Sequence, residues 1–253
     1  MRIPGFMQDP VTHYSRCFSQ DFSLKTDKSA RRGGRVLSFE CCRTIELPVA
    51  PASAYCLGKR SFDLLVGLAL LGPVLLLSTM VALLILISDK ATPIFWQKRV
   101  GKGGRVFWFP KFRTMIVGAE HLMPQIRHYN QHSNSITFKM EDDFRVTGLG
   151  RHLRRWSLDE LPQFLCVLRG DMSLVGPRPA LVDEVEKYGP AEMQRLMVKP
   201  GLTCLWQVGG RSDLPFSQQL ALDLKYIETK SLWLDFLIVL KTIPAVLSRR
   251  GAY

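Results

Sequence analysis

The sequence predicts an α+β protein that is mostly helical and is embedded in a membrane through one segment. Residues 64–87 carry no charged side chain. As a helix at about 1.5 Å per residue they would measure about 36 Å, enough to cross a bilayer core. Residues 94–115 hold two short strand-like runs around a glycine-rich turn, which is typical of a β-hairpin. Much of the chain after residue 160 places apolar residues at helical spacing.

Size and charge narrow the class of protein. The chain has 253 residues, of which 47% are hydrophobic, so it can bury a substantial core. Its formal net charge of +12 favours anionic partners such as a membrane surface or a phosphorylated substrate. Nucleic acid is not expected, because no Lys/Arg run exceeds two residues and none alternates with aromatics. The six cysteines lack metal-ligand spacing and are interpreted as free thiols.

Three regions are expected along the chain. Residues 1–57 are mixed and weakly periodic, predict a flexible arm without chemistry, and do not resemble a cleaved signal peptide. Residues 58–89 form the membrane segment, and residues 90–253 form a larger domain after it.

The apolar segment contains Gly72 and Pro73 near its middle. Proline removes a backbone donor and clashes with the preceding turn, so we expect a kink there. The segment then either spans the membrane as a kinked helix or re-enters and leaves by the same face. Basic residues flank both ends, with Lys59 and Arg60 before and Lys90 after, and such residues favour the cytoplasmic side. The residues alone leave both alternatives open, together with a buried helix of a soluble domain.

The hairpin region carries two candidate phosphate ligands. Lys111 and Arg113 alternate with Phe112, so in a strand both would point to the same face. The alternative is a solvated strand face. The turn at residues 101–104 is not a phosphate-binding loop, because it lacks the required spacing and a following helix.

Further helices are expected over residues 161–168, 182–197 and 216–227. Residues 232–247 are strongly apolar but include Asp235, which makes a poor spanning segment. This last stretch is either an amphipathic helix lying in the membrane interface or a core helix of the domain.

The adjacent carboxylates Asp159 and Glu160 are the strongest candidates for chemistry. Acidic side chains among arginines, here Arg154 and Arg178, suit metal-assisted phosphoryl transfer. The alternative is structural, because Ser157 and Glu160 have the spacing of a helix-capping box.

Two other segments could contact a substrate. Arg178 lies between Pro177 and Pro179, which stiffen the backbone and would present the guanidinium to a phosphate, although a solvated surface turn has the same pattern. Gln207 and Arg211 follow Trp206 and could contact a base or a sugar, whereas core packing of Trp206 is the alternative.

Taken together, these motifs resemble a family, the monotopic polyprenyl-phosphate phosphoglycosyl transferases among the bacterial sugar transferases. The resemblance runs from about Lys59 to the end of the chain. The matching pieces are Lys59-Arg-Ser-Phe-Asp63, Gln97-Lys-Arg-Val-Gly101, Lys111-Phe-Arg-Thr-Met115, Arg145-Val-Thr147, residues 153–163, residues 172–179, Lys199-Pro-Gly-Leu-Thr203 and Leu205-Trp-Gln207. The tail at residues 241–253 is similar to the exopolysaccharide-production branch.

The resemblance implies an activity and roles for residues. It implies transfer of a sugar 1-phosphate from a UDP-sugar, with glucose or galactose as the expected sugar, to undecaprenyl phosphate, which releases UMP. Asp159 would be the nucleophile and Glu160 would bind Mg²⁺, while Lys111, Arg154 and Arg178 would hold phosphate. It also favours the re-entrant path, with the break at Gly72 and Pro73, in the bacterial inner membrane and with membrane lipid around it. Residues 90–253 would then be the sugar transferase catalytic domain, at the cytoplasmic face.

Two other functions are alternatives to this one. A phosphatidyl-alcohol synthase would need several spanning helices, whereas this chain offers one long apolar segment. A non-catalytic membrane scaffold of the polysaccharide machinery would need neither Glu160 nor Arg178.

Overall fold

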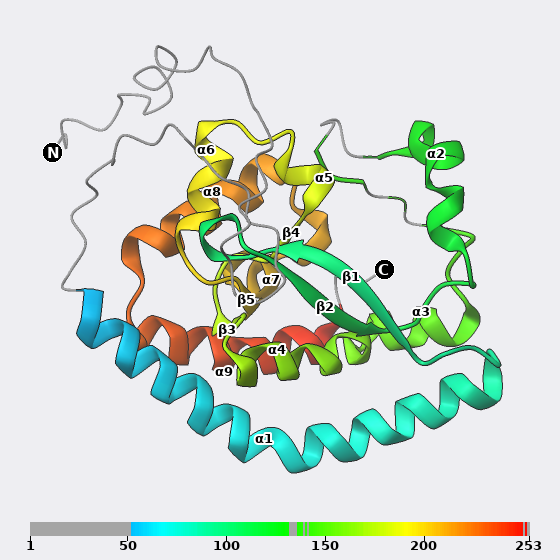
Figure 1. Ribbon diagram of the computed structural model, residues 1–253, viewed down its shortest axis with the longest axis horizontal. Coiled ribbons are helices and arrows are strands. Elements are labelled where there is room, and N and C mark those ends of the chain that lie inside the picture. The colour runs from blue at the N-terminus through cyan, green and yellow to red at the C-terminus, as the bar shows by residue number, and fades with distance from the viewer. Residues whose placement is uncertain (1–51, 132–135, 139, 141, 250, 252–253) are drawn as a thin grey trace, which may run out of the picture.

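The computed structural model describes residues 52–131, 136–138, 140, 142–249 and 251. Most of the predicted N-terminal arm, residues 1–51, lies outside the described residues. The described chain begins with a long helix, continues into a β-hairpin and ends in two helices (Figure 1).

Helix α1, Ala52–Ser88, contains the predicted apolar segment and continues through Pro73. Figure 1 shows it bent about half-way along, so the kink is confirmed while the helix itself is unbroken. By length and composition, its residues 55–88 could cross a membrane. Most of its apolar side chains are exposed, among them Leu65, Leu76 and Ile87. A core helix of a soluble domain would bury these residues, so that interpretation is wrong.

The predicted hairpin is confirmed. Strand β1, Ile94–Val100, pairs antiparallel with β2, Val106–Phe112, over its whole length. The turn between them, η2 at Lys102–Gly104, has φ of 67° at Gly103, a left-handed conformation that glycine adopts without strain. Strand β4, Ala180–Leu181, pairs with the other edge of β1, so the sheet order is β2-β1-β4.

A second, two-stranded sheet fixes the start of the Arg178 segment. Strand β3, Ser173–Val175, runs parallel to β5, Gly201–Thr203. The backbones come so close after β3 that a Cβ atom at Gly201 would lie 2.1 Å from the amide nitrogen of Gly176. Both glycines are therefore required for this approach.

The rest of the described chain is helical, in mostly short segments. In chain order these are η3 Ala119–Leu122, α2 Met123–Ile126, η4 Arg127–Tyr129, α3 Gly148–Arg155, η5 Leu158–Gln163, α4 Phe164–Arg169, α5 Val182–Val185, α6 Pro190–Met193, η6 Gln194–Met197, α7 Leu205–Gly209, η7 Arg211–Asp213, α8 Phe216–Thr229 and α9 Leu232–Ser248. The helices expected near residues 161–168, 216–227 and 232–247 are confirmed. The single helix expected over residues 182–197 is wrong, because the chain breaks at Gly189-Pro190 and restarts with proline in the first turn of α6.

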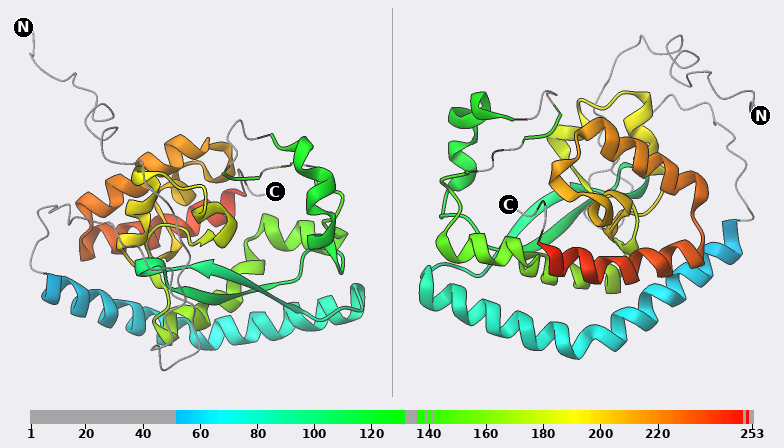
Figure 2. Two further views of the ribbon diagram at one scale, coloured as in Figure 1. Left: turned by 45° about the horizontal axis from the view of Figure 1, so that its top comes forward. Right: turned by 180° about the vertical axis from the view of Figure 1, so that it is seen from behind.

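The elements form layers that Figures 1 and 2 show from three sides. Helices α1, α4 and α9 lie together on one side, the hairpin lies above them, and α5, α6 and α8 cover the far side. The main core lies between the hairpin and the last two helices, and it includes Phe109, Met172, Tyr226 and Ile238.

Both halves of α1 are attached to the same domain. In the first half, Arg60 donates to the carbonyls of Val167 and Leu168 at 2.7 and 2.8 Å, at the end of α4. Asp63 accepts from the Ser173 hydroxyl at 2.9 Å, and so joins α1 to β3. In the second half, Val81 and Ile85 are buried in a cluster that also contains Phe112 and Leu153. The bend therefore separates two anchored arms.

Candidate active site

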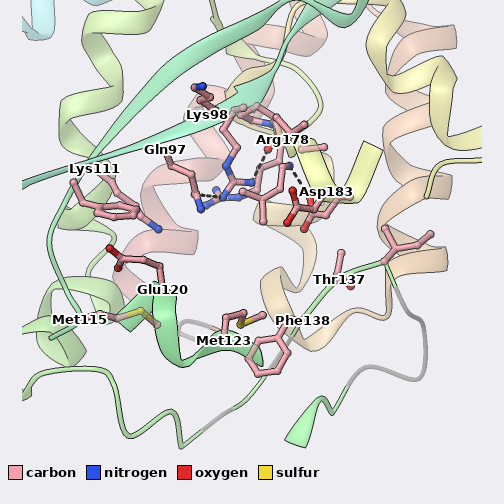
Figure 3. A pocket seen from close by; sticks show the side chains of 18 of the residues that line it. Gln97, Lys98, Lys111, Met115, Glu120, Met123, Thr137, Phe138, Arg178 and Asp183 are labelled. Carbon is pink, nitrogen blue, oxygen red and sulfur yellow. Dashed lines mark hydrogen bonds between the residues drawn. The ribbon is translucent and has the colours of Figure 1, made fainter. Parts of the chain in front are cut away.

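A large, strongly basic cavity lies beside the hairpin. Its volume is about 1220 Å³ and it is bordered by β1 and β2, by η3 and α2, and by the chain from Arg178 to α5 (Figure 3). Nine basic side chains line it: Lys98, Arg99, Lys111, Arg113, Arg145, Arg154, Arg178, Lys187 and Arg195. The acidic ones are Glu120, Asp183 and Glu184. This excess of positive charge attracts anionic ligands.

Asp159 and Glu160 lie in η5, between α3 and α4. The predicted capping box is absent, because the Ser157 side chain makes no capping hydrogen bond. Ser157 instead has φ of 55°, a left-handed conformation that is uncommon outside glycine and that gathers at functional sites. Both carboxylates therefore lie in the first turn of η5 without a serine cap before them. Neither is among the residues that line the cavity, but Glu160 contacts Arg178, which does line it.

The arginines predicted around the acidic pair do surround it. Arg178 donates to Glu160 Oε1 at 2.5 Å, so its interpretation as a solvated surface turn is wrong. Arg154 donates through Nε to the Thr114 hydroxyl at 2.9 Å. Burial and the neighbouring Glu160 raise the pKa of Asp159 to about 6, against the opposing charges of Arg154 and two other cations. Asp159 is therefore mostly ionised at pH 7.

Lys111 and Arg113 share one face of the hairpin, as predicted. Both cationic groups lie over the Phe95 ring, 5.5 and 5.8 Å from its centroid. Figure 3 shows Lys111 pointing into the cavity. Arg113 is held at the rim, where its Nε donates to the carbonyl of Thr92 at 2.8 Å. Burial, and next the charge of Arg99, lower the pKa of Lys111 to about 8, so a bound phosphate would stabilise its charged form.

Trp206, Gln207 and Arg211, the predicted substrate contacts after β5, lie in different environments. Trp206 is buried in α7, which confirms core packing, although it also lines the cavity. Gln207 accepts a hydrogen bond from the Cys204 thiol at 3.1 Å and is not among the residues that line the cavity. Burial lowers the pKa of Arg211, and the negative charge of the nearby Glu160 opposes this shift. Neither Gln207 nor Arg211 lines the cavity, but Arg211 lies near the acidic pair.

The residues present fit a magnesium ion shared with a substrate. Within the described part of the chain no three acidic, His or Cys side chains gather to hold a metal by themselves. Mg²⁺ is commonly bound by one or two carboxylates together with phosphate oxygens and water. Glu160 supplies such a carboxylate, next to Arg178 of the basic cavity.

Two arginines of this wall, Arg99 and Arg195, were not predicted from the sequence. Arg99 lies within the family motif Gln97–Gly101, and this motif is the signal that could have identified it. Arg195 lay inside an expected amphipathic helix, where a charged residue has no special meaning. In the fold it is buried, at 8% exposure.

Paired carboxylates at a basic cavity, in a domain carried by a long apolar helix, define a class of membrane-associated protein that handles phosphorylated compounds. The comparison with known families agrees, because residues 54–249 match the family described as bacterial sugar transferase. The chain belongs to the bacterial sugar transferase family and at that level is a transferase enzyme.

Three relatives illustrate the family. The chain is 41% identical over 203 residues to the exopolysaccharide production protein ExoY of Rhizobium meliloti. This alignment covers 78% of the chain and 88% of ExoY. It is 48% identical over 166 residues to the galactosyl transferase CpsE of Streptococcus agalactiae, covering 65% of this chain but only 37% of the relative. It is 40% identical over 214 residues to a UDP-glucose:undecaprenyl-phosphate glucose-1-phosphate transferase of Caulobacter vibrioides, covering 80% and 74%.

Proposed function

We propose that this chain transfers a sugar 1-phosphate from a UDP-sugar to undecaprenyl phosphate and releases UMP, as the first step of an exopolysaccharide repeat unit. The observation that carries the proposal is the acidic pair Asp159 and Glu160, with Arg178 of the cavity wall bonded to Glu160. The names of relatives support the substrate class, since one names UDP-glucose and undecaprenyl phosphate and another a galactosyl transfer. Glucose and galactose are the expected sugars.

The proposed reaction has two displacements at one phosphorus atom. A carboxylate oxygen of Asp159 attacks the β-phosphorus, and the bond from that phosphorus to the oxygen bridging to the α-phosphate breaks, so UMP leaves with the electron pair. An oxygen of undecaprenyl phosphate then attacks the same phosphorus and displaces Asp159. The carboxylate is restored, and the lipid carries a sugar diphosphate.

Cations make this meeting of negative groups possible. A carboxylate, a diphosphate and a lipid phosphate repel one another unless fixed positive charges offset the repulsion. Lys111, Arg154 and Arg178 line the cavity close enough to Asp159 to oppose the rise of its pKa. Arg178, now on Glu160, can hold two acceptors at once through its planar fork. Mg²⁺, held by Glu160 together with substrate phosphates, would supply further neutralising charge.

We also propose that α1 re-enters the membrane rather than spanning it. Its two arms are anchored to one domain, and Figure 1 shows both ends turned towards that domain with the bend farthest away. Exposed apolar residues of α9, including Trp233, Phe236, Leu240 and Ile243, recur every three or four positions. Helix α9 itself lies on the side of the molecule where α1 lies (Figure 2). The opposite face of α9 buries Asp235 and Ile238, so this helix packs on the core and would rest in the membrane interface.

The path of α1 predicts that both flanks are cytoplasmic. In sealed cells, neither the exposed Cys56 nor a cysteine introduced by Lys90→Cys should react with a membrane-impermeant maleimide until the cells are permeabilised. A periplasmic cysteine protein in the same cells verifies that the reagent works. Labelling of either flank in intact cells would contradict the re-entrant path.

The released nucleotide tests the function directly. The full chain in detergent, with undecaprenyl phosphate, Mg²⁺ and UDP-glucose or UDP-galactose, should release one UMP for each lipid-linked sugar. At pH 7 Asp159, with a pKa of about 6, is ionised, and Lys111, with a pKa of about 8, is protonated. Chelation of Mg²⁺ should stop the reaction. Release of UDP instead would show that the sugar moves without its phosphate, and a folded chain that releases neither nucleotide would favour a scaffold.

A further inference from the structure

We propose that Arg99 and Arg195 are positioning residues that hold the loop of Arg178 from two sides and thereby fix its guanidinium for phosphate binding. This inference rests on the proposed function, because it assigns the two arginines to the same site. Neither arginine has to bind the substrate directly, because each donates a hydrogen bond from its guanidinium group to a backbone carbonyl of the loop.

The chemistry of the loop explains why carbonyl groups must hold it. Pro177 and Pro179 have no backbone N–H, so the segment can be fixed chiefly through its acceptors. Three successive carbonyls each receive a donor. The amide of Gly201 donates to Pro177 at 2.9 Å, Arg195 Nη2 donates to Arg178 at 3.2 Å, and Arg99 Nη1 donates to Pro179 at 2.9 Å.

Arg195 is itself rigidly placed. Its Nε donates to Asp223 Oδ2 at 2.9 Å, and its Nη1 donates to the Tyr188 hydroxyl at 2.6 Å. It is buried between the Tyr188 and Phe216 rings, each 5.8 Å from its central carbon. The guanidinium therefore has three acceptors from three different segments, and the third is the backbone of Arg178.

Arg99 approaches from the hairpin. Its Nη2 donates to Gln97 Oε1 at 2.9 Å, and its guanidinium lies 5.2 Å from the centroid of the Phe109 ring. Figure 3 shows Gln97 and Arg178 on the same wall of the cavity. Strand β1 also pairs with β4, which begins directly after Pro179. The loop is thus tied to the hairpin that carries Lys111.

The consequence is preorganisation of Arg178. Its side chain reaches Glu160 at 2.5 Å while its backbone is fixed on both sides, so the fork does not have to be ordered when a phosphate arrives. Lysine cannot replace either arginine fully, because a single ammonium on a flexible stem cannot serve two separated acceptors in a fixed plane. A displacement of about 1 Å at such a site can cost about 100-fold in rate.

The test is a double-mutant cycle on UMP release. Arg99→Lys and Arg195→Lys should each lower kcat/KM about 10- to 100-fold in the wild-type background. In an Arg178→Lys background, each should change kcat/KM by less than about twofold, because both act through Arg178. Arg105→Lys, at an exposed site of the hairpin turn, is the matched control and should change neither background.

Two results would overturn the proposal. Equal losses in both backgrounds would show that Arg99 and Arg195 act independently of Arg178. Unchanged kcat/KM in a folded Arg99→Lys enzyme, whose site is less buried than that of Arg195, would do the same. The proposed function fails separately, in the wild-type enzyme, if no UMP is released.

Discussion

Replacement of Asp159 by asparagine should abolish UMP release. Asparagine keeps the shape of the side chain but has no nucleophilic carboxylate, so the first displacement cannot occur. Loss of a covalent nucleophile commonly costs well over about 10³-fold in kcat. With UDP-glucose labelled in the β-phosphate and no lipid acceptor, the wild-type chain should acquire the label and release at most one UMP per active site. The Asp159→Asn chain should do neither.

A matched carboxylate provides the control. Asp171→Asn removes a partly exposed carboxylate that lies 4.0 Å from Arg105, outside η5 and its acidic pair. Its UMP release should equal that of the wild-type chain. Full turnover by Asp159→Asn would remove Asp159 from the role of nucleophile, while labelled protein in that variant would place the attacking group on another side chain.

The sequence predicted those parts of the protein that depend on local pattern. The uncharged run of α1, the hairpin and α8 follow from composition and periodicity, and the acidic pair with Arg178 follows from its motifs. The capping box at Ser157 failed because that residue has a positive φ, and sequence spacing alone carries no information about φ. The prediction of one helix over residues 182–197 was wrong because it relied on apolar spacing and ignored the helix-breaking pair Gly189-Pro190.

Contacts between residues far apart in the sequence could not be predicted from it. Arg195 pairs with Asp223, 28 positions later, and with the carbonyl of Arg178, 17 positions earlier. No periodicity links such positions, so only the fold shows that a helical arginine supports the site. Helix α9 was ambiguous for a related reason. An apolar stretch does not reveal which of its faces meets the core, and in the structure one face does while the other stays exposed.

Asp235→Ala should cause a large loss of stability. Asp235 is fully buried in α9 and accepts three hydrogen bonds, from Lys59 Nζ at 2.7 Å, from the Tyr55 hydroxyl at 3.1 Å and from the Tyr226 hydroxyl at 2.7 Å. The carboxylate therefore joins α1, α8 and α9 at one point. Alanine would leave the ammonium of Lys59 without its counter-charge in a site that is only 14% exposed. Removing one partner of such a pair costs about 3–5 kcal/mol.

Thermal unfolding of the full chain in detergent measures this loss. A chain of this size should lose about 6–20 °C in melting temperature, at about 2–4 °C per kcal/mol. Asp171→Ala, which removes the surface carboxylate near Arg105, should change stability by at most about 1 kcal/mol. A shift no larger than that of Asp171→Ala would show that the junction at Asp235 does not hold α1 to the domain.

A double replacement separates a buried charge from a lost contact. Lys59→Met together with Asp235→Leu replaces the ion pair by apolar groups of similar volume, which is often neutral for stability when a buried pair is removed whole. If the cost of Asp235→Ala comes from the uncompensated Lys59 ammonium, the double variant should be clearly more stable than Asp235→Ala alone. If it is equally unstable, the hydrogen bonds of Tyr55 and Tyr226 carry the junction, and the attachment of α1 depends on the hydroxyls rather than on the charge.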